Sequence, residues 1–436
     1  MQRLLLKQLE DWIGLSSRKP ILLDGARQSG KSYLLKELFG KGHFPKVHVI
    51  DFLKTPKASV LFDENLEPER WVNDLSLLLN TAVNPSEDLI ILDEVGECPR
   101  AVQALKFIAE EQPSWFVCAS GSNIGLLDHF PVGKVHGLTL RPMNFEEFIM
   151  ALGSEQQQAA YQLMDRRELV HRQLWPLLMD YFYVGGMPEA VACWKRAQGD
   201  SLIERRRRVR KVQQDILQGY ERDFGKYAGK VNALHINQVF SSVVGQLQKN
   251  IDGSVRRYTF NQVIEKKKSY RDFSNIIDWL EKTHLVSKSY VINQKPQSPL
   301  RMQRKESFFK LFYVDVGLLC CQLGISESVL AMKDMMYKGP IVENFVQNEL
   351  LSYGLRESYS WHENTAEIEF VLDTAAGIVP IEVKAGKNTQ AKSLKSYNSR
   401  YAPPITMKLI GAVGGNYTHQ RVLPLYYTKA LVEFIE

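Results

Sequence analysis

The chain has 436 residues, of which 44% are hydrophobic and 24% charged, with a formal net charge of +6, which describes a soluble protein large enough for about three domains. Its five cysteines show no C-x-x-C spacing, so we expect a reducing, cytoplasmic location and neither a disulfide framework nor structural zinc. Charges interrupt any signal-peptide core, and no apolar run approaches the roughly 20 residues of a spanning helix, so we expect no membrane insertion.

The first motif in chain order is a phosphate-binding loop. An apolar run at residues 21–23 precedes the pattern G-x-x-x-x-G-K-[ST], and a helix-forming stretch follows it. In such a P-loop the backbone N–H groups surround phosphate, the lysine reaches the β- and γ-phosphates, and the hydroxyl binds Mg²⁺. The sequence therefore predicts nucleoside triphosphate binding by Gly25, Ala26, Arg27, Gln28, Ser29, Gly30, Lys31 and Ser32.

A second motif ends the apolar strand expected at residues 89–92, where Asp93 and Glu94 follow directly. A buried parallel strand is apolar throughout, and its carboxyl end faces the P-loop. We therefore expect Asp93 to hold Mg²⁺ through water and Glu94 to polarise the attacking water as the general base.

The strand expected at residues 115–119 opens into small polar residues, Ser120-Gly121-Ser122-Asn123. This position is where a strand edge meets the nucleotide, so Ser122 and Asn123 are candidate sensors of the γ-phosphate. An ordinary Ser/Gly turn would have the same sequence, and this alternative stays open.

The middle of the chain is predicted to be largely helical. Residues 146–230 carry apolar positions at helical spacing, and the Gly185–Gly186 pair in a Gly-Gly-Met-Pro turn predicts a structural break between helices. A basic run at residues 205–211 fits either a nucleic-acid contact or the solvated face of a charged helix.

Residues 231–330 have the element order of a winged helix, in which short helices alternate with a strand pair, notably at residues 258–264, 269–280 and 285–291. The helix expected at residues 273–281 would be the recognition element, with Ile276, Ile277 and Leu280 facing inward. A winged helix used only for packing or for protein contacts is the alternative. Basic residues precede this helix and would face a nucleic-acid groove: Lys266, Lys267, Lys268 and Arg271.

A second chemical signal lies near the C-terminus, in Glu343, Glu369, Glu382 and Lys384. Their order resembles a restriction-endonuclease-like core, which implies that a helix carboxylate, a strand carboxylate and an E-x-K strand converge on Mg²⁺. Alternation places Glu382 and Lys384 on one face of a strand. The strand carboxylate of that core is usually Asp, so Glu369 leaves open a degenerate fold kept for binding or assembly.

Over nearly its whole length the chain resembles the AAA-type ATPases of bacteria and archaea that carry a C-terminal domain of unknown function. The resemblance implies ATP and Mg²⁺ as cofactors and allows a homo-oligomer, because relatives often form rings. The chain departs from the family pattern at Lys134, where the family usually has Arg. A lysine offers a single point charge, whereas an arginine can donate two hydrogen bonds in parallel. The resemblance rests on the P-loop and on residues 92–94, 119–122, 140–148 and 185–190.

We therefore predict an α/β protein in four parts: an AAA-type P-loop ATPase domain (1–145), a helical lid or linker (146–230), a winged-helix-like domain (231–330) and a restriction-endonuclease-like α/β domain (331–436). The expected function is Mg²⁺-dependent ATP hydrolysis coupled to DNA binding or remodelling, with catalytic roles for Lys31, Glu94 and Ser122. The alternatives are a nucleotide-dependent switch that acts on protein partners and an ATP-gated, metal-dependent nuclease.

Overall fold

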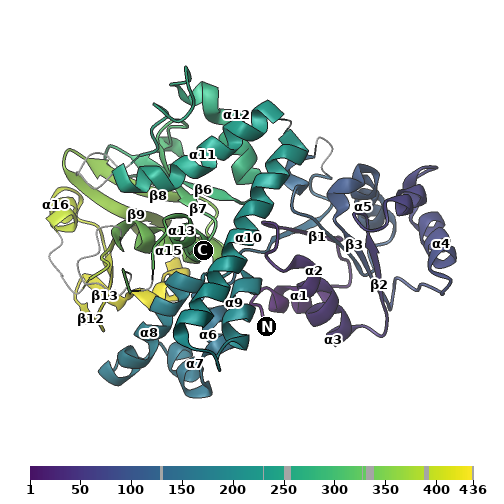
Figure 1. Ribbon diagram of the computed structural model, residues 1–436, viewed down its shortest axis with the longest axis horizontal. Coiled ribbons are helices and arrows are strands. Elements are labelled where there is room, and N and C mark those ends of the chain that lie inside the picture. Colours follow the sequence, from purple (N-terminus) through teal and green to yellow (C-terminus); the bar gives the residue numbers. More distant parts are fainter. Residues whose placement is uncertain are drawn as a thin grey trace. The chain divides into compact units, whose positions relative to one another are not determined.

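The computed structural model describes residues 1–127, 131–228, 230–249, 257–326, 328–329, 338–386 and 392–434 (Figure 1). Backbone contacts divide the chain into two compact units. The first unit comprises residues 1–142 with 282–284, and the second comprises residues 143–281 with 285–436. Within the described ranges, no helix has the length and apolar character needed to cross a membrane.

The first unit is built on a five-stranded sheet in the order β2-β3-β4-β1-β5, and all neighbouring strands pair in parallel. Strand β4 therefore lies between the P-loop strand β1 and the strand β3 that ends in Asp93. The carboxyl ends of parallel strands meet at one edge, so all three motifs share that edge. The strands are β1 (Ile21–Asp24), β2 (Val47–Asp51), β3 (Leu89–Asp93), β4 (Val117–Ser120) and β5 (His136–Thr139).

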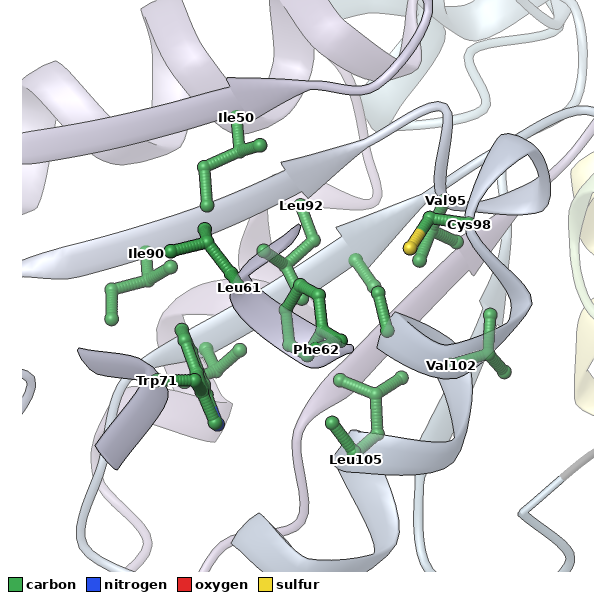
Figure 2. Close-up of a cluster of buried hydrophobic side chains, with 14 of the residues drawn as sticks. Ile50, Leu61, Phe62, Trp71, Ile90, Leu92, Val95, Cys98, Val102 and Leu105 are labelled. Carbon is green, nitrogen blue, oxygen red and sulfur yellow. The ribbon is translucent and has the colours of Figure 1, made fainter. Parts of the chain in front are cut away.

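Helices cover both faces of this sheet, which is why β3 is buried at every position. Figure 2 shows the cluster on one face, where Ile90 and Leu92 pack with Trp71 and Leu105 from the helices. Ile91, which lies between them on β3, points to the opposite face and packs in a second hydrophobic cluster. The helical segments are α1 (Leu6–Ile13), α2 (Lys31–Tyr33), η1 (Leu34–Gly40), α3 (Lys41–His43), η2 (Pro56–Phe62), α4 (Pro68–Leu79), η3 (Val95–Glu97), α5 (Pro99–Glu111) and η4 (Ile124–Leu126).

The second unit begins with helices, as the sequence predicts for its middle region. Its helical segments are α6 (Phe145–Leu152), α7 (Glu155–Gln162), α8 (Glu168–Val184), α9 (Pro188–Arg196), α10 (Leu202–Ala228), α11 (Lys230–Lys249), α12 (Tyr270–Lys282), η6 (Leu300–Gln303), α13 (Val316–Gln322), α15 (Lys338–Ser352), α16 (Lys392–Tyr401) and η7 (Leu425–Phe434). On α12 the buried residues are Phe273, Ile277 and Leu280, whereas Ile276 is only half-buried.

The Gly185–Gly186 turn after α8 has a structural role. Gly185 adopts φ +74°, and a Cβ at Gly186 would lie 1.9 Å from the carbonyl oxygen of Met143. The Gly186 N–H donates to Asp315 at 2.6 Å. Only glycine allows the backbones of this turn and of residue 143 to approach so closely.

Two arginines of the basic run in α10, Arg205 and Arg210, are used within the protein. The Arg205 guanidinium stacks 3.6 Å from the centre of the Trp194 ring. Arg210 stacks on Tyr183 at 4.0 Å and donates to the carbonyls of Gly317 and Ile325. These contacts anchor α10 and weaken the nucleic-acid interpretation of the run.

The second unit contains a mixed eight-stranded sheet in the order β12-β13-β11-β10-β9-β8-β6-β7. Strands β6 and β7 form the antiparallel pair expected for a wing, but β6 also pairs in parallel with β8, so the hairpin extends the C-terminal sheet. The predicted boundary at residue 330 lies outside the described residues. The strands are β6 (Val286–Ile292), β7 (Phe309–Tyr313), β8 (Ser358–Glu363), β9 (Ala366–Thr374), β10 (Gly377–Val383), β11 (Thr406–Ile410), β12 (Gly415–Tyr417) and β13 (Gln420–Pro424).

Candidate active site

The P-loop connects β1 to α2 and has the backbone that its glycines predict. Gly25 and Gly30 adopt φ +145° and +95°, which glycine reaches without steric cost. A Cβ at Gly25 would lie 2.2 Å from the carbonyl oxygen of Leu140, so the loop passes close against the segment after β5.

Lys31 is held inside this loop. Its Nζ donates to the carbonyl oxygens of Gly25 at 2.8 Å and of Ala26 at 3.0 Å, and the residue is 6% exposed. Burial lowers the pKa of Lys31, while the nearby carboxylate of Glu94 acts in the opposite direction. A nucleotide phosphate would replace these carbonyls as the partner of the ammonium group.

Arg3 fastens the outer side of the same loop, a role that the sequence motifs do not indicate. Its Nη1 donates to the carbonyl of Ser29 at 2.8 Å and its Nη2 to the carbonyl of Arg141 at 2.6 Å. The side chain thus joins the P-loop to the segment after β5. Arg3 is 7% exposed, so little water competes for these bonds.

Asp93 lies at the carboxyl end of β3, and one of its carboxylate oxygens already accepts hydrogen bonds within the protein. Its Oδ1 accepts hydrogen bonds from the Ser120 Oγ at 2.6 Å and from the Glu94 N–H at 3.1 Å. Ser120 ends β4, next to β3, and is fully buried. The hydrogen bond from Ser120 fixes the orientation of the Asp93 carboxylate. Its other oxygen, Oδ2, is therefore left for a water molecule bound to Mg²⁺.

Glu94 occupies a strained position beside the P-loop. Its φ of +51° is unusual for a residue with a side chain and is typical of functional sites. Burial raises the pKa of Glu94, opposed by the charge of Lys31. A carboxylate with a raised pKa is a better proton acceptor, which suits the role of general base.

The other expected residues of this site lie at the same edge of the sheet. Ser32 is exposed on the first turn of α2, and Ser122 and Asn123 are half-buried after β4. The side chain of Ser122 makes no hydrogen bond with the described residues, so it is free to meet a phosphate. Lys134 instead forms an ion pair with Glu110 of α5 at 2.8 Å.

The C-terminal constellation lies in the second unit, where the structure brings its residues together. The Lys384 Nζ is 2.8 Å from Glu382 Oε1 and 3.5 Å from Glu369 Oε1. Glu369 also accepts the N–H of Val383 at 3.0 Å. Burial, together with the charges of Glu343 and other nearby carboxylates, raises the pKa of Glu369 to about 7, although Lys384 opposes the shift.

Lys310 of β7 is a member of this site that the motifs did not indicate. Its Nζ lies 3.3 Å from Glu343 Oε2 and 2.5 Å from Glu367 Oε1. Its only signal in the sequence is that a lysine stands at the second position of the otherwise apolar strand F-K-L-F-Y. In the parts of the chain that the structure describes, no three His, Cys, Asp or Glu side chains are grouped so as to hold a metal ion.

Comparisons with known proteins agree with the fold of the first unit. A family profile described as an AAA domain matches residues 17–149. Two profiles for domains of unknown function, DUF8612 and DUF4143, match residues 176–329 and 338–426. No curated protein matches the chain significantly.

Among solved structures, the chain is similar to the Walker-type ATPase PABY2304 of Pyrococcus abyssi, with 13% identity and a TM-score of 0.41 over 73% of this chain and 94% of that one. The assignment rests on the AAA profile, whose match includes residues 25–32, and on the P-loop backbone at Gly25 and Gly30. Residues 17–149 therefore form an AAA-type P-loop ATPase domain, and two domains of unknown function follow it in the chain.

Proposed function

We propose that this ATPase couples Mg²⁺-dependent ATP hydrolysis to the binding or remodelling of DNA. The residues at the β-sheet edge fit a Mg²⁺–ATP complex. The exposed Ser32 hydroxyl and the free oxygen of Asp93 would hold the metal, directly and through water, and Mg²⁺ would neutralise charge on the phosphates. The homo-oligomer implied by the resemblance stays a prediction.

Each residue of the site would then have a separate task. Lys31 would exchange its loop carbonyls for β- and γ-phosphate oxygens. Glu94 would orient the attacking water and accept its proton, and Ser122 would contact the γ-phosphate opposite that water. Ser120 would act on the metal only through Asp93, because its hydroxyl is already bonded to that carboxylate.

The observation that supports DNA as the partner is a basic patch at the start of α12, which we call the α12 patch: the exposed Lys266, Lys268 and Arg271 and the half-buried Lys267. Within the described residues its one ion pair joins Lys266 to the exposed Glu265 at 3.9 Å, and the charge of Asp272 also acts on Lys267. In α10, by contrast, Arg207 lies 3.4 Å from Glu204. Unneutralised lysines and arginines on one surface are the electrostatic signature of phosphate binding.

The test measures ATP hydrolysis by the whole chain with single-stranded, duplex and branched DNA at ~0.1 M salt. Lys31→Ala and Glu94→Gln define the background. We expect one form of DNA to stimulate hydrolysis, and we expect the double variant Lys267→Glu/Arg271→Glu to lose the stimulation while keeping basal hydrolysis.

Arg207→Glu is the matched control, because it reverses an exposed charge on α10 outside the α12 patch. It should retain DNA stimulation. Hydrolysis unmoved by every DNA would sink the DNA proposal and favour the alternative, a nucleotide-dependent switch that acts on protein partners. Equal loss in Arg207→Glu would assign the effect to net charge and not to the α12 patch.

A further inference from the structure

The restriction-endonuclease-like interpretation of the C-terminal site requires a divalent metal ion. In that chemistry the carboxylates hold Mg²⁺, and the ion activates water beside the scissile phosphodiester. The relevant carboxylates are nearly inaccessible to solvent, since Glu343, Glu369 and Glu382 are 6%, 7% and 1% exposed. Buried carboxylates need a compensating positive charge, which either a metal ion or a protein cation can supply.

Protein cations supply that charge here. Lys310 is within ion-pair distance of Glu343 and Glu367, and Lys384 is within ion-pair distance of Glu369 and Glu382. These four carboxylates therefore meet two ammonium groups. Lys408 adds a third cation that acts electrostatically on Glu382.

Lys310 is the unusual member of this set. Lys384 belongs to the E-x-K pattern, in which a lysine assists the nucleophile, so its position agrees with either interpretation. Lys310 comes from a different element, β7, and only 8% of its side chain is exposed. Burying an ammonium group is costly unless carboxylates pair with it, so Glu343 and Glu367 hold Lys310 in place.

We propose that Lys310 takes the place of the divalent metal ion in this site, so that the site is closed to Mg²⁺ and Mn²⁺. Glu343 and Glu367 already form ion pairs with Lys310, and a second cation placed beside the Lys310 ammonium group would be repelled. This proposal does not depend on DNA coupling or on ATP hydrolysis.

Glu382 makes the proposal testable, because the site keeps one unused ligand atom. Its Oε2 is buried and has no hydrogen-bond partner, while its Oε1 pairs with Lys384. If the ammonium group of Lys310 were removed, Glu343 and Glu367, whose charges act together with that of Glu382 on Glu369, would lose its compensating charge. The site would then have the carboxylates that a hard divalent cation prefers.

The experiment titrates Mn²⁺ alone into the nucleotide-free, full-length protein and follows the loss of the free-ion EPR signal. Lys310→Met removes the charge and keeps a flexible chain of similar length. We expect this variant to bind Mn²⁺ at least tenfold more tightly than the wild type. Glu382→Gln added to Lys310→Met should abolish the gain.

Lys310→Arg, which keeps the positive charge, should behave as the wild type. Any weak Mn²⁺ binding at the ATP site is present in all of these proteins, and comparison with an Asp93→Asn variant measures its size. The proposal is overturned if the wild type binds Mn²⁺ tightly and loses it in Glu382→Gln, or if folded Lys310→Met shows no gain.

Thermal unfolding of each variant establishes that it is folded. Should Lys310→Met fail to fold, the comparison of the wild type, Lys310→Arg and Glu382→Gln still decides the question. A Glu382-dependent Mn²⁺ site in the wild type refutes the proposal, and equal, weak binding by all three supports it.

Discussion

Arg3 is predicted to set the affinity of the P-loop for ATP, although it lies outside the sequence motifs that identify the ATPase. Replacing Arg3 with Ala removes the hydrogen bonds to the carbonyls of Ser29 and Arg141, at 2.8 and 2.6 Å. The Ser29 end of the loop then loses its connection to the segment after β5. We expect the loop to sample conformations in which its N–H groups no longer converge on phosphate.

The size of the effect follows from the charge and burial of the guanidinium. A hydrogen bond from a charged donor contributes about 1.5–3 kcal/mol, so the pair of bonds contributes about 3–6 kcal/mol. Most of this is expected as lost stability of the first unit. If about 1.4 kcal/mol of it orders the loop for binding, ATP affinity falls about tenfold.

The assay combines steady-state ATP hydrolysis with calorimetric binding of a non-hydrolysable ATP analogue. Arg3→Ala should raise KM and the analogue Kd about tenfold and leave kcat nearly unchanged, because Arg3 does not reach the reacting atoms. Arg3→Lys should give an intermediate value, since one ammonium group cannot reproduce the fork of a guanidinium.

Arg18→Ala is the matched control for this prediction. Arg18 also anchors backbone in the first unit, by donating to the carbonyls of Ser114 and Leu15. Its loss should lower stability without altering KM. An unchanged KM in Arg3→Ala, or an equal rise in Arg18→Ala, would refute the assignment of Arg3 to the loop.

Ser120→Ala should lower kcat about tenfold and raise the Mg²⁺ concentration needed for half-maximal hydrolysis, since it loses a hydrogen bond to a charged group worth about 1.5–3 kcal/mol. Ser122→Ala should lower kcat and leave the Mg²⁺ requirement unchanged. Identical Mg²⁺ titration curves for the two variants would contradict these separate roles. Burial raises the pKa of Glu349 of α15 to about 8, so the folded state favours the protonated carboxyl group. The stability that this group contributes is therefore complete below about pH 4.5 and is lost as the pH rises through 8. Glu349→Gln should therefore be more stable than the wild type by a few kcal/mol at pH 9, with the difference shrinking toward pH 5 in urea unfolding; a pH-independent difference would be evidence against it. Gly186→Ala should lower the free energy of unfolding by about 3 kcal/mol, whereas Gly199→Ala, with open space around its Cβ position, should change it by less than about 0.5 kcal/mol.

The C-terminal carboxylates show where sequence reasoning succeeded only in part. Alternation along the E-x-K strand placed Glu382 beside Lys384, and the structure has them 2.8 Å apart. The same pattern could not reveal Lys310, which lies 33 and 57 residues from its partners Glu343 and Glu367. Whether the site holds a metal ion depends on that distant lysine.

The middle region shows the same division. The sequence predicts its helices and the strand at β6, because hydrophobic periodicity reports which face of each element is buried. Residues 258–264 form no strand, and β6 pairs instead with β7. The pairing of β6 with β8 was not predictable, since a strand carries no local mark of the distant strand it will join. The use of the α10 arginines was equally hidden, because Trp194 and Tyr183 reach them only through helix packing.

By itself the sequence determined the P-loop, the Asp93–Glu94 pair and the order of the elements around them. These features depend on the φ preferences of glycine and on apolar runs, which act between neighbours in the chain. The tertiary structure decided which side chains complete each site: Arg3 at the P-loop, Ser120 on Asp93 and Lys310 among the carboxylates. Such contacts join residues far apart in sequence, so only the packing of the whole unit brings them within hydrogen-bond distance.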